Sequence, residues 1–317
     1  MKCKWIKKLT AGIIFLAAVG SLSGCQKAAT SENLFRDIEV NMTSVESAEE
    51  NQIVKLQMGD GDSAISQESN LDIEMTRNPA SVHRKGQQKT NMAGTKETQE
   101  MESYQVEEDG KTVIYSGTDE AWEKNAVEEK ETSSQQTVLF DGLQNLSGAF
   151  SVSQDLATVN KEECFELTGT ISGTQFQETF ADTLKALLGE DSSDLSGWNL
   201  QASEDEENNE ELQQKLNNVK VDCVIDIYRS NILPAKITFD LTDYLKAAGE
   251  ENAQVTSYTL EVTFVSYNDI KKIKVPKAVK ESAKDNGEDE AENSTDEMLE
   301  EENQEATAEA EDRKSVV

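Results

Sequence analysis

The chain of 317 residues contains one histidine, four cysteines and three prolines. One histidine leaves no room for a metal site with several histidine ligands, and a His-based catalytic triad would have to use His83. Four cysteines without a paired C-x-x-C pattern do not form a zinc module. The few prolines, together with 17 glycines, exclude collagen-like and Pro-rich linker architectures.

Basic residues are also scarce. The chain has 30 Lys plus Arg against 62 Asp plus Glu, which gives a formal net charge of −32. A protein that binds nucleic acid needs clustered Lys and Arg to neutralise phosphates, so we expect no nucleic-acid partner. Aromatic residues make up only 6% of the chain and charged residues 29%, so the residues that form a core must be concentrated in part of it.

Residues 1–24 have the pattern of a secretory signal peptide, with lysines before a short apolar run at 11–19. This run is too short for a transmembrane helix. The sequence Leu22-Ser23-Gly24-Cys25 resembles the bacterial lipobox, which implies diacylglycerol transfer to the Cys25 thiol and cleavage before Cys25. The alternative is an ordinary signal peptide, or an anchor, with an incidental cysteine. We expect residues 25–32 to form a tether and the acidic surface to be repelled by anionic lipids.

Apolar and polar residues that alternate with a period of two predict half-buried strands of an antiparallel sheet. Residues 34–42 show this pattern first, with Ile38, Val40 and Met42 on one face. The pattern returns in segments whose apolar residues are Val54, Leu56 and Met58; Leu71, Ile73 and Met75; Tyr104 and Val106; Val113 and Tyr115; Phe165, Leu167 and Ile171; Val221, Cys223, Ile225 and Ile227; Ile237, Phe239 and Leu241; and Tyr258, Leu260, Val262 and Phe264. Residues 77–100 predict a long exposed hairpin.

Two amphipathic helices are predicted from apolar residues at spacings of three and four. The stripe of the first helix consists of Leu139, Leu143, Leu146 and Phe150. The stronger stripe of the second consists of Phe176, Phe180, Leu184, Leu187 and Leu188. Thr174 and Gln177 fit a capping box at the start of the second helix, and Gly189 fits the position after its end.

Two acidic segments stand apart from these elements. Residues 190–218 predict a mobile connector within the domain, and residues 281–317, with 15 acidic and three basic side chains, predict a disordered tail. Almost nothing in the tail can offset an ordering entropy of ~1–2 kcal/mol per residue. The remaining residues, 33–280, predict an α+β domain: a curved antiparallel β half-barrel with helices packed on its concave face.

The order of elements resembles the LolA/LppX-like half-barrel lipoproteins, and most closely uncharacterised Gram-positive lipoproteins of that type. The resemblance is carried by the hairpin that ends at Trp122, the strand–Gly–helix unit at 165–188, the Ile-Tyr and Leu-Pro-Ala-Lys-Ile hairpin at 226–240, and the terminal strand with its closing Ile-Lys-Val-Pro at 264–276. The acidic connector and tail are additions to that pattern. Relatives with this fold carry acyl chains in the concave cavity, which implies a similar ligand here as an expectation.

The stripe of the stronger helix is the candidate lining of an apolar ligand cavity: Phe176, Phe180, Leu184 and Leu187. The alternative is that these side chains fill the core, as such stripes usually do. We expect His83 to be exposed, because its neighbours in the sequence are polar. Asp60-Gly61-Asp62 does not continue as a calcium-binding EF-hand loop, so we expect no metal site and no cofactor.

Cys164 and Cys223 are the cysteines that remain after signal cleavage and lipidation. An exported chain with two remaining cysteines favours a disulfide. However, alternation places Cys164 with Glu166 and Thr168, whereas Cys223 shares the apolar face of its strand with Val221. The disulfide and the pair of free thiols therefore both remain open on the sequence.

These patterns predict a lipid-anchored protein on the extracytoplasmic face of the cell membrane, and the resemblance points to the Gram-positive plasma membrane. The preferred hypothesis, which the resemblance and the Phe-rich helix motivate, is a carrier of an apolar, acyl-chain-like ligand. We expect it to be non-catalytic, because no nucleophile–base pair is visible in the sequence. The alternative is a structural or protein-interaction protein of the cell envelope that has no small-molecule ligand. The membrane, through Cys25, is the one partner expected in both cases.

Overall fold

The computed structural model describes residues 29–60, 64–118, 121–127, 142–188, 206–248 and 254–285. Cys25 and the rest of the predicted signal and lipobox lie outside the described residues, as does the tail beyond residue 285. The backbone of residues 181–188 is described, but the side chains of Leu184 and Leu187 are not.

Twelve strands form one sheet in the order β12-β6-β5-β4-β3-β2-β1-β11-β10-β9-β8-β7. Neighbours are antiparallel, except that β12 runs parallel to β6. The strands are β1 Ser47–Met58, β2 Ile65–Arg77, β3 Ala80–Met92, β4 Thr95–Glu108, β5 Lys111–Thr118, β6 Ala121–Val127, β7 Phe150–Val159, β8 Glu162–Ser172, β9 Lys220–Tyr228, β10 Pro234–Asp240, β11 Val255–Tyr267 and β12 Ala283–Asp285.

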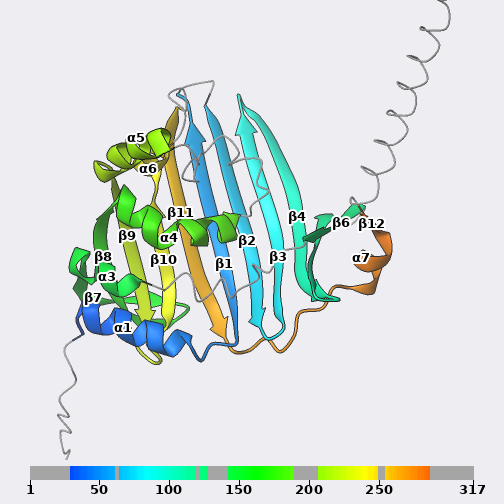
Figure 1. Ribbon diagram of the computed structural model, residues 1–317, viewed down its shortest axis with the longest axis horizontal. Coiled ribbons are helices and arrows are strands. Elements are labelled where there is room, and N and C mark those ends of the chain that lie inside the picture. Colours follow the sequence, from blue (N-terminus) through cyan, green and yellow to red (C-terminus); the bar gives the residue numbers. More distant parts are fainter. Residues whose placement is uncertain are drawn as a thin grey trace, which may run out of the picture.

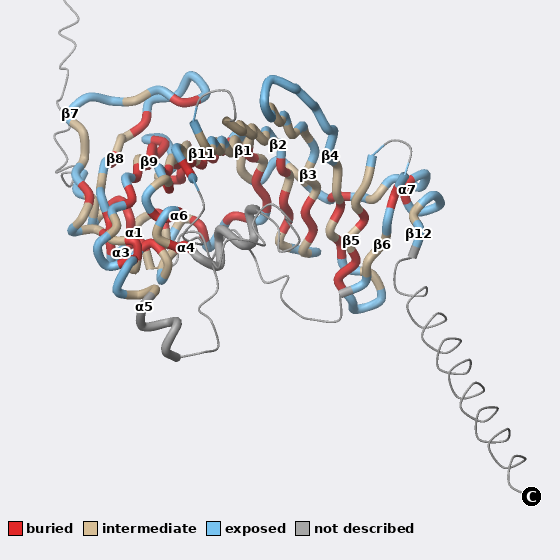
Figure 2. The backbone as a smooth tube through the Cα atoms, turned by 90° about the horizontal axis from the view of Figure 1, so that it is seen from above, coloured by how far each residue is buried: buried red, intermediate tan, exposed pale blue. Residues whose placement is uncertain are grey.

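The helices gather on one side of this sheet. Figure 2 shows the sheet as an arch, with α1, α3, α5 and α6 inside it on the half formed by β7–β11, and Figure 1 shows α4 running from that half across β11 toward β1. Figure 1 shows α7 apart from them, at the far edge beside β12. The predicted α+β half-barrel with helices on its concave face is therefore confirmed. The helices are α1 Ser31–Met42, α3 Leu143–Leu146, the short 3-10 helix η2 Ser147–Ala149, α4 Gly173–Leu188, α5 Glu206–Asn217, α6 Thr242–Ala248 and α7 Lys277–Ser282.

The strand predicted at residues 34–42 is wrong, because this segment forms helix α1. Ile38 and Met42, which fit a period of two, are also four apart and fit a helix. Together with Leu34 and Phe35 they bury one side of α1, whereas Val40 is 62% exposed. The side chain of Thr30 accepts a hydrogen bond from the Asn33 amide at 3.3 Å and so caps the helix. The predicted tether therefore ends inside the first helical turn.

The two predicted amphipathic helices have different outcomes. Of the first, residues 143–149 form α3 and η2, Leu139 lies outside the described residues, and Phe150 begins strand β7, which was not predicted. The second is confirmed as α4, but its cap lies two residues earlier than predicted. The Ser172 hydroxyl accepts from the Gln175 amide at 3.1 Å, and the Gln175 side chain accepts from the Ser172 amide at 3.0 Å. This reciprocal pair is the capping box.

Both acidic segments are more structured than predicted. Residues 206–217 of the expected mobile connector form helix α5, whose Leu216 is fully buried in the main core. Residues 281–285 of the expected disordered tail complete α7 and form β12, whose Ala283 pairs with Trp122. A few apolar side chains in each segment were enough to dock it on the domain.

The core of the described residues consists of four clusters, of which the largest lies on the concave face and the next on the convex face. The large cluster packs α1, α3, α4, α5 and α6 against β7–β11. In the convex cluster, Tyr104, Val106, Tyr115 and Trp122 pack against Ile273 and Val279 of the C-terminal segment. The sheet is thus covered by helices at one end and by the C-terminal segment on its other face at the opposite end.

Candidate functional site

The concave face continues beyond the helix-covered half onto β1, β2 and β3. Val54, Leu56 and Met58 of β1 pack against the large core cluster, so alternate residues of β1 face the concave side. The strand register carries this face onto β2 and β3. Its rows, read from β1 to β3, are Met58–Ile65–Met92, Leu56–Gln67–Thr90, Val54–Ser69–Gln88, Gln52–Leu71–Gly86, Glu50–Ile73–Arg84 and Ala48–Met75–Val82.

Part of this face presents apolar side chains that are not fully covered. Met92 on β3 is 55% exposed. Met101, which lies on β4 opposite Gly86 of β3, is 37% exposed. The others are half-buried. We call this set the concave apolar surface: Val54, Leu56, Met58, Ile65, Leu71, Met92 and Met101. Along β1 these side chains are continuous, whereas on β2 and β3 Gln67, Ser69, Gln88 and Thr90 separate Ile65 and Met92 from Leu71. Exposed apolar side chains that gather on one face are candidates for contact with an apolar partner or ligand.

Two buried polar side chains lie beside the concave apolar surface. Glu50 is 0% exposed and Gln52 2% exposed, and both point to the concave face between apolar neighbours. Both carboxyl oxygens of Glu50 and the amide oxygen of Gln52 have no hydrogen-bond partner among the described residues. We call them the buried acceptor pair. A buried polar group that makes no hydrogen bond costs roughly 1–3 kcal/mol, so the position of this pair does not favour stability.

The electrostatics of this pair follow from its burial. Loss of hydration raises the pKa of the Glu50 carboxyl to about 7, and the positive charge of Arg84 opposes that rise. Arg84 faces the same side two strands away, with Ile73 between them in the row. Burial lowers the pKa of the Arg84 guanidinium, while the Glu50 charge raises it. The concave face therefore combines apolar side chains with a weakly acidic, strongly desolvated carboxyl.

The predicted cavity-lining residues of α4 lie in the core. Phe176 is 0% and Phe180 1% exposed. Their rings pack on Phe239 at centroid distances of 5.2 and 4.9 Å, and Phe176 also packs on Tyr244 at 5.0 Å. These two side chains hold α4 on the sheet. Leu184 and Leu187 lie outside the described side chains.

His83 is not exposed as predicted. It lies on the opposite, convex face of β3, where its side chain is 19% exposed. Its ring nitrogens lie 3.1 Å from a carboxylate oxygen of Glu74 and 3.0 Å from one of Glu102, and its ring stacks on Tyr104 with centroids 4.3 Å apart. Sequence neighbours predicted exposure, but cross-strand neighbours decide it. Among the described residues, no group of His, Cys, Asp or Glu is arranged to hold a metal ion.

Cys164 and Cys223 are free thiols, so the disulfide is ruled out in this structure. They lie on adjacent strands, but Cys164 is paired with Tyr228 and Cys223 with Gly169. The two positions are five residues apart along the register, so their side chains point to opposite faces. The alternation that argued against a bridge is the physical reason. Burial raises the pKa of both thiols, which keeps them protonated.

A polar hollow of about 270 Å³ lies at the ends of β9, β10 and β11. Its carboxylates are engaged by neighbouring hydroxyls: Asp240 accepts from Thr242 at 2.6 Å and Asp222 from Thr170 at 2.6 Å. This hollow offers no apolar contact and no unpaired group comparable with Glu50, so the concave face remains the candidate site. The hollow is lined by Lys220, Asp222, Asp240, Thr242, Asp243, Thr256 and Ser257.

The buried acceptor pair was not predicted from the sequence. The alternation of Val54, Leu56 and Met58 predicted a strand, and the same parity extended backwards reaches Gln52 and Glu50. Polar residues at positions whose parity is otherwise apolar were the available signal. Arg84 carried no such signal, because its burial depends on pairing between distant strands.

Over most of its length the chain is similar to solved structures of lipoproteins and LolA-like proteins, which its sequence patterns resemble. It is 11% identical to LprF from Mycobacterium bovis, with a TM-score of 0.42, over 78% of this chain and 96% of that one. It is 12% identical to the lipoprotein LppX from Mycobacterium tuberculosis, with a TM-score of 0.40, over 77% and 98%. A LolA superfamily protein from Nitrosomonas europaea matches at 10% identity with a TM-score of 0.22, over 80% and 97%.

Residues 30–284 match the model of a family described as "Family of unknown function (DUF6612)". The match begins at Thr30, the cap of α1, and ends within β12, so it spans the described fold. A comparison with curated proteins gave no match. None of the helices that the structure describes is long and apolar enough to span a membrane.

Proposed function

The chain belongs to the DUF6612 family, and we propose that it is an extracytoplasmic lipoprotein, anchored through Cys25, that carries an apolar, acyl-chain-like ligand on its concave face without catalysing a reaction. The observation that carries this proposal is the concave apolar surface. Its half-buried and exposed apolar side chains lie on the same face as the helix-packed core and continue it across β1, β2, β3 and β4.

The composition of this surface suits a flexible hydrocarbon chain. Three of its seven side chains are methionines, and these include both exposed ones, Met92 and Met101. Methionine adapts to irregular apolar partners because it is unbranched and polarizable. Each CH₂ group that a ligand buries contributes about 0.8 kcal/mol. Carrying such a ligand needs no catalytic group, only apolar area and a way to exclude water.

The buried acceptor pair refines the class of ligand. Glu50 and Gln52 are enclosed beside the apolar surface, so a ligand reaches their acceptor oxygens only by displacing the apolar side chains around them. A ligand that does so and brings hydroxyl or ammonium donors would supply the hydrogen bonds that the described residues do not make. The ligand we propose is therefore an amphiphile, with its hydrocarbon on the concave apolar surface and its donor group at Glu50 and Gln52.

The carrier function is tested by native mass spectrometry of the lipids that co-purify with the protein. Met92→Glu and Met101→Glu place charges on the concave apolar surface at exposed positions, so they should lower lipid occupancy severalfold without unfolding the domain. Val265→Glu is the matched control, because Val265 is 47% exposed but does not belong to this surface. Absence of lipid from the wild-type protein, or equal occupancy in all variants, would favour an envelope structural or interaction protein instead.

The anchor is tested separately. Cys25→Ala removes the thiol that the lipobox presents, and it should release the protein from the membrane fraction, since stable anchoring needs more than one weak contact. Unchanged fractionation of the variant would contradict lipidation at Cys25. It would leave the concave site untouched.

A further inference from the structure

The distribution of positive charge on this acidic protein is uneven. Residues 269–284 contain six lysines and only two acids, Asp269 and Glu281, in a chain whose net charge is −32. All six lysine side chains are exposed. We call this segment the lysine strip: Lys271, Lys272, Lys274, Lys277, Lys280 and Lys284.

The fold holds the lysine strip in a fixed place. Asn268, just before it, accepts from the Glu46 amide at 2.7 Å and donates its own amide to the Ser47 carbonyl at 2.8 Å. Within the strip, Ile273 and Val279 are buried in the convex cluster, so the lysines beside them point outward. The burial of Ile273 and Val279 therefore fixes the side of the segment on which the lysines lie.

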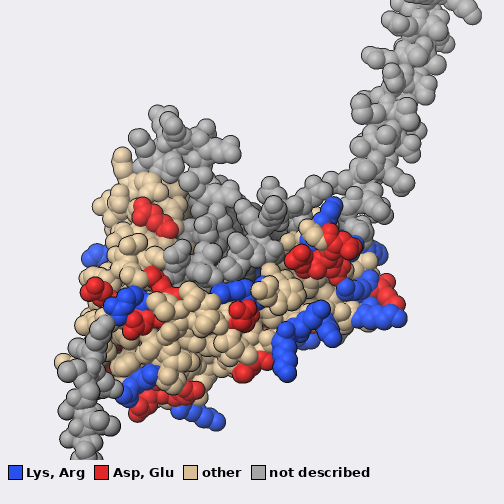
Figure 3. Space-filling model, turned by 60° about the horizontal axis from the view of Figure 1, so that its bottom comes forward, with Lys and Arg blue, Asp and Glu red and all other residues tan. Residues whose placement is uncertain are grey.

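Few of these cations are neutralised by nearby acids. The Nζ of Lys277 lies 3.3 Å from a carboxylate oxygen of Glu281, and Lys280 forms an ion pair with Glu108. Lys271, Lys272, Lys274 and Lys284 have no ion-pair partner among the described residues. In Figure 3 the bottom edge of the molecule as drawn in Figure 1 is turned toward the viewer, and Lys and Arg side chains gather over its right half.

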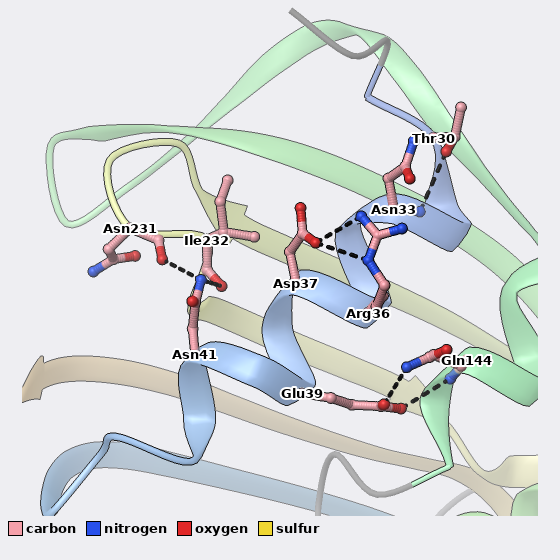
Figure 4. A network of polar contacts seen from close by, with 9 residues as sticks. All are labelled: Thr30, Asn33, Arg36, Asp37, Glu39, Asn41, Gln144, Asn231 and Ile232. Carbon is pink, nitrogen blue, oxygen red and sulfur yellow. Dashed lines mark hydrogen bonds and ion pairs between the residues drawn. The ribbon is translucent and has the colours of Figure 1, made fainter.

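The start of the domain lies along this same edge. In Figure 1, α1 and the segment that follows β11 run along the same edge of the sheet. Contacts hold α1 there: Asn41 donates to the Asn231 carbonyl at 2.9 Å, and the Gln144 amide donates to Glu39 at 3.3 Å (Figure 4). Five residues lie between Cys25 and Ser31, and the six residue-to-residue steps of ~3.3–3.6 Å allow a reach of about 20 Å.

We propose that the lysine strip is a second membrane contact, which docks this edge of the half-barrel on an anionic lipid surface. The inference rests on the anchoring part of the proposed function for its geometry, because an acyl chain near Ser31 would bring the edge close to the bilayer. The net charge of the chain alone predicts repulsion from an anionic bilayer. However, salt screens charges that lie more than a Debye length of about 10 Å from the lipid, so the charges nearest the bilayer decide whether the protein is attracted or repelled. A single acyl chain with a basic patch is a known combination for stable attachment.

The proposal is tested with the mature chain, residues 25–317, that carries Cys25→Ala so that no acyl chain contributes. Binding is measured by flotation with vesicles of phosphatidylcholine alone or with about one third phosphatidylglycerol. We expect binding only to the anionic vesicles and loss of binding at high salt. The variant with Lys271→Gln, Lys272→Gln and Lys274→Gln should partition at least about tenfold more weakly, because each lysine near such a surface contributes severalfold.

The control variant carries Lys55→Gln, Lys89→Gln and Lys96→Gln, which removes the same charge from exposed lysines outside the strip. Equal partitioning of the two triple variants, or equal binding to both kinds of vesicle, would overturn the proposal. So would binding that appears only after deletion of residues 286–317, because the chain's own acidic tail would then be the partner of the strip. None of these results depends on Cys25 or on a carried ligand, so they leave the proposed function to its own tests.

Discussion

At the scale of single residues, Glu50 occupies a position that is costly for a carboxyl. A carboxyl that is fully buried without a hydrogen-bond partner loses its hydration and gains little in return. Its nearest compensating charge, Arg84, lies two strands away in the register. A fully buried carboxyl with a raised pKa is a candidate for a role in binding.

The raised pKa of Glu50 predicts a specific pH dependence of stability. Its folded pKa is about 7 against an ordinary value of 4.5, so the folded protein binds a proton more tightly than the unfolded chain. The contribution of this bound proton to the free energy of unfolding is fully present below pH 4.5 and is lost as the pH rises through 7. The total loss is roughly 3 kcal/mol.

Urea unfolding of wild type and Glu50→Gln between pH 4.5 and 8 measures this loss. The variant should gain on wild type as the pH rises, since glutamine does not ionise. Glu49→Gln, on the neighbouring half-buried residue, is the control and should show no such trend. Parallel curves for Glu50→Gln and wild type would mean that the carboxyl is hydrated in solution.

A second prediction at this scale concerns a close packing contact. A Cβ added at Gly169 would lie 2.6 Å from the ring of Phe150, which itself packs edge-on against Phe35 at 5.2 Å. Gly169→Ala should therefore cost about 1–3 kcal/mol of unfolding free energy through overpacking. Gly148→Ala has nothing within 4 Å of its new Cβ and should be nearly neutral in the same denaturation experiment.

At the scale of elements, the ends of helices were fixed by side chains that periodicity does not reveal. The apolar stripe of α4 was visible in the sequence, but two candidate capping boxes overlap within residues 172–177. Ser172 rather than Thr174 became the cap, because β8 ends at Ser172 and its last residue already has an extended backbone. Thr174 bonds to Asn217 of α5 instead, at 2.8 Å.

Removal of this cap should destabilise α4. Ser172→Ala deletes the hydroxyl that accepts from the Gln175 amide, and it should cost about 1 kcal/mol in thermal or urea unfolding. Ser172→Asp retains an acceptor at the same position and should recover most of the loss. A loss of equal size in both variants would indicate that Ser172 acts through its pairing with β9, not as a cap.

At the scale of the whole molecule, the C-terminal segment closes the far end of the sheet. β12 pairs with β6, and Val279 and Ile273 cover Tyr104, Tyr115 and Trp122 on the convex face. The boundary of the folded domain therefore lies near residue 285, beyond the predicted end at residue 280. The same segment carries the lysine strip, so one element both stabilises the sheet and presents charge.

Two truncations separate these regions. Deletion of 286–317, with 13 acidic and two basic residues, should leave unfolding free energy within about 1 kcal/mol of wild type. Deletion of 277–317 also removes Val279 and β12, and it should cost at least about 2 kcal/mol by uncovering Trp122. Equal stability of the two truncations would show that α7 and β12 do not pack on β6 in solution.

The sequence by itself determined the properties that depend on near neighbours along the chain. A period of two located strands such as β11, a stripe at spacings of three and four located α4, and composition established the acidic character of the chain. The resemblance supplied the half-barrel. Residues 34–42 show the limit of this reasoning, because the positions of Ile38 and Met42 satisfy both a strand and a helix, and only burial of Leu34 and Phe35 against the core selects the helix.

Tertiary structure decided everything that depends on pairing between distant segments. Register placed Glu50, Ile73 and Arg84 in one row, put the two thiols on opposite faces and enclosed His83 between Glu74 and Glu102. It also brought the lysine strip to the edge where α1 lies, although some 230 residues separate them along the chain. Strand register is fixed by the sum of many contacts across the sheet, and local periodicity carries no information about which strands become neighbours.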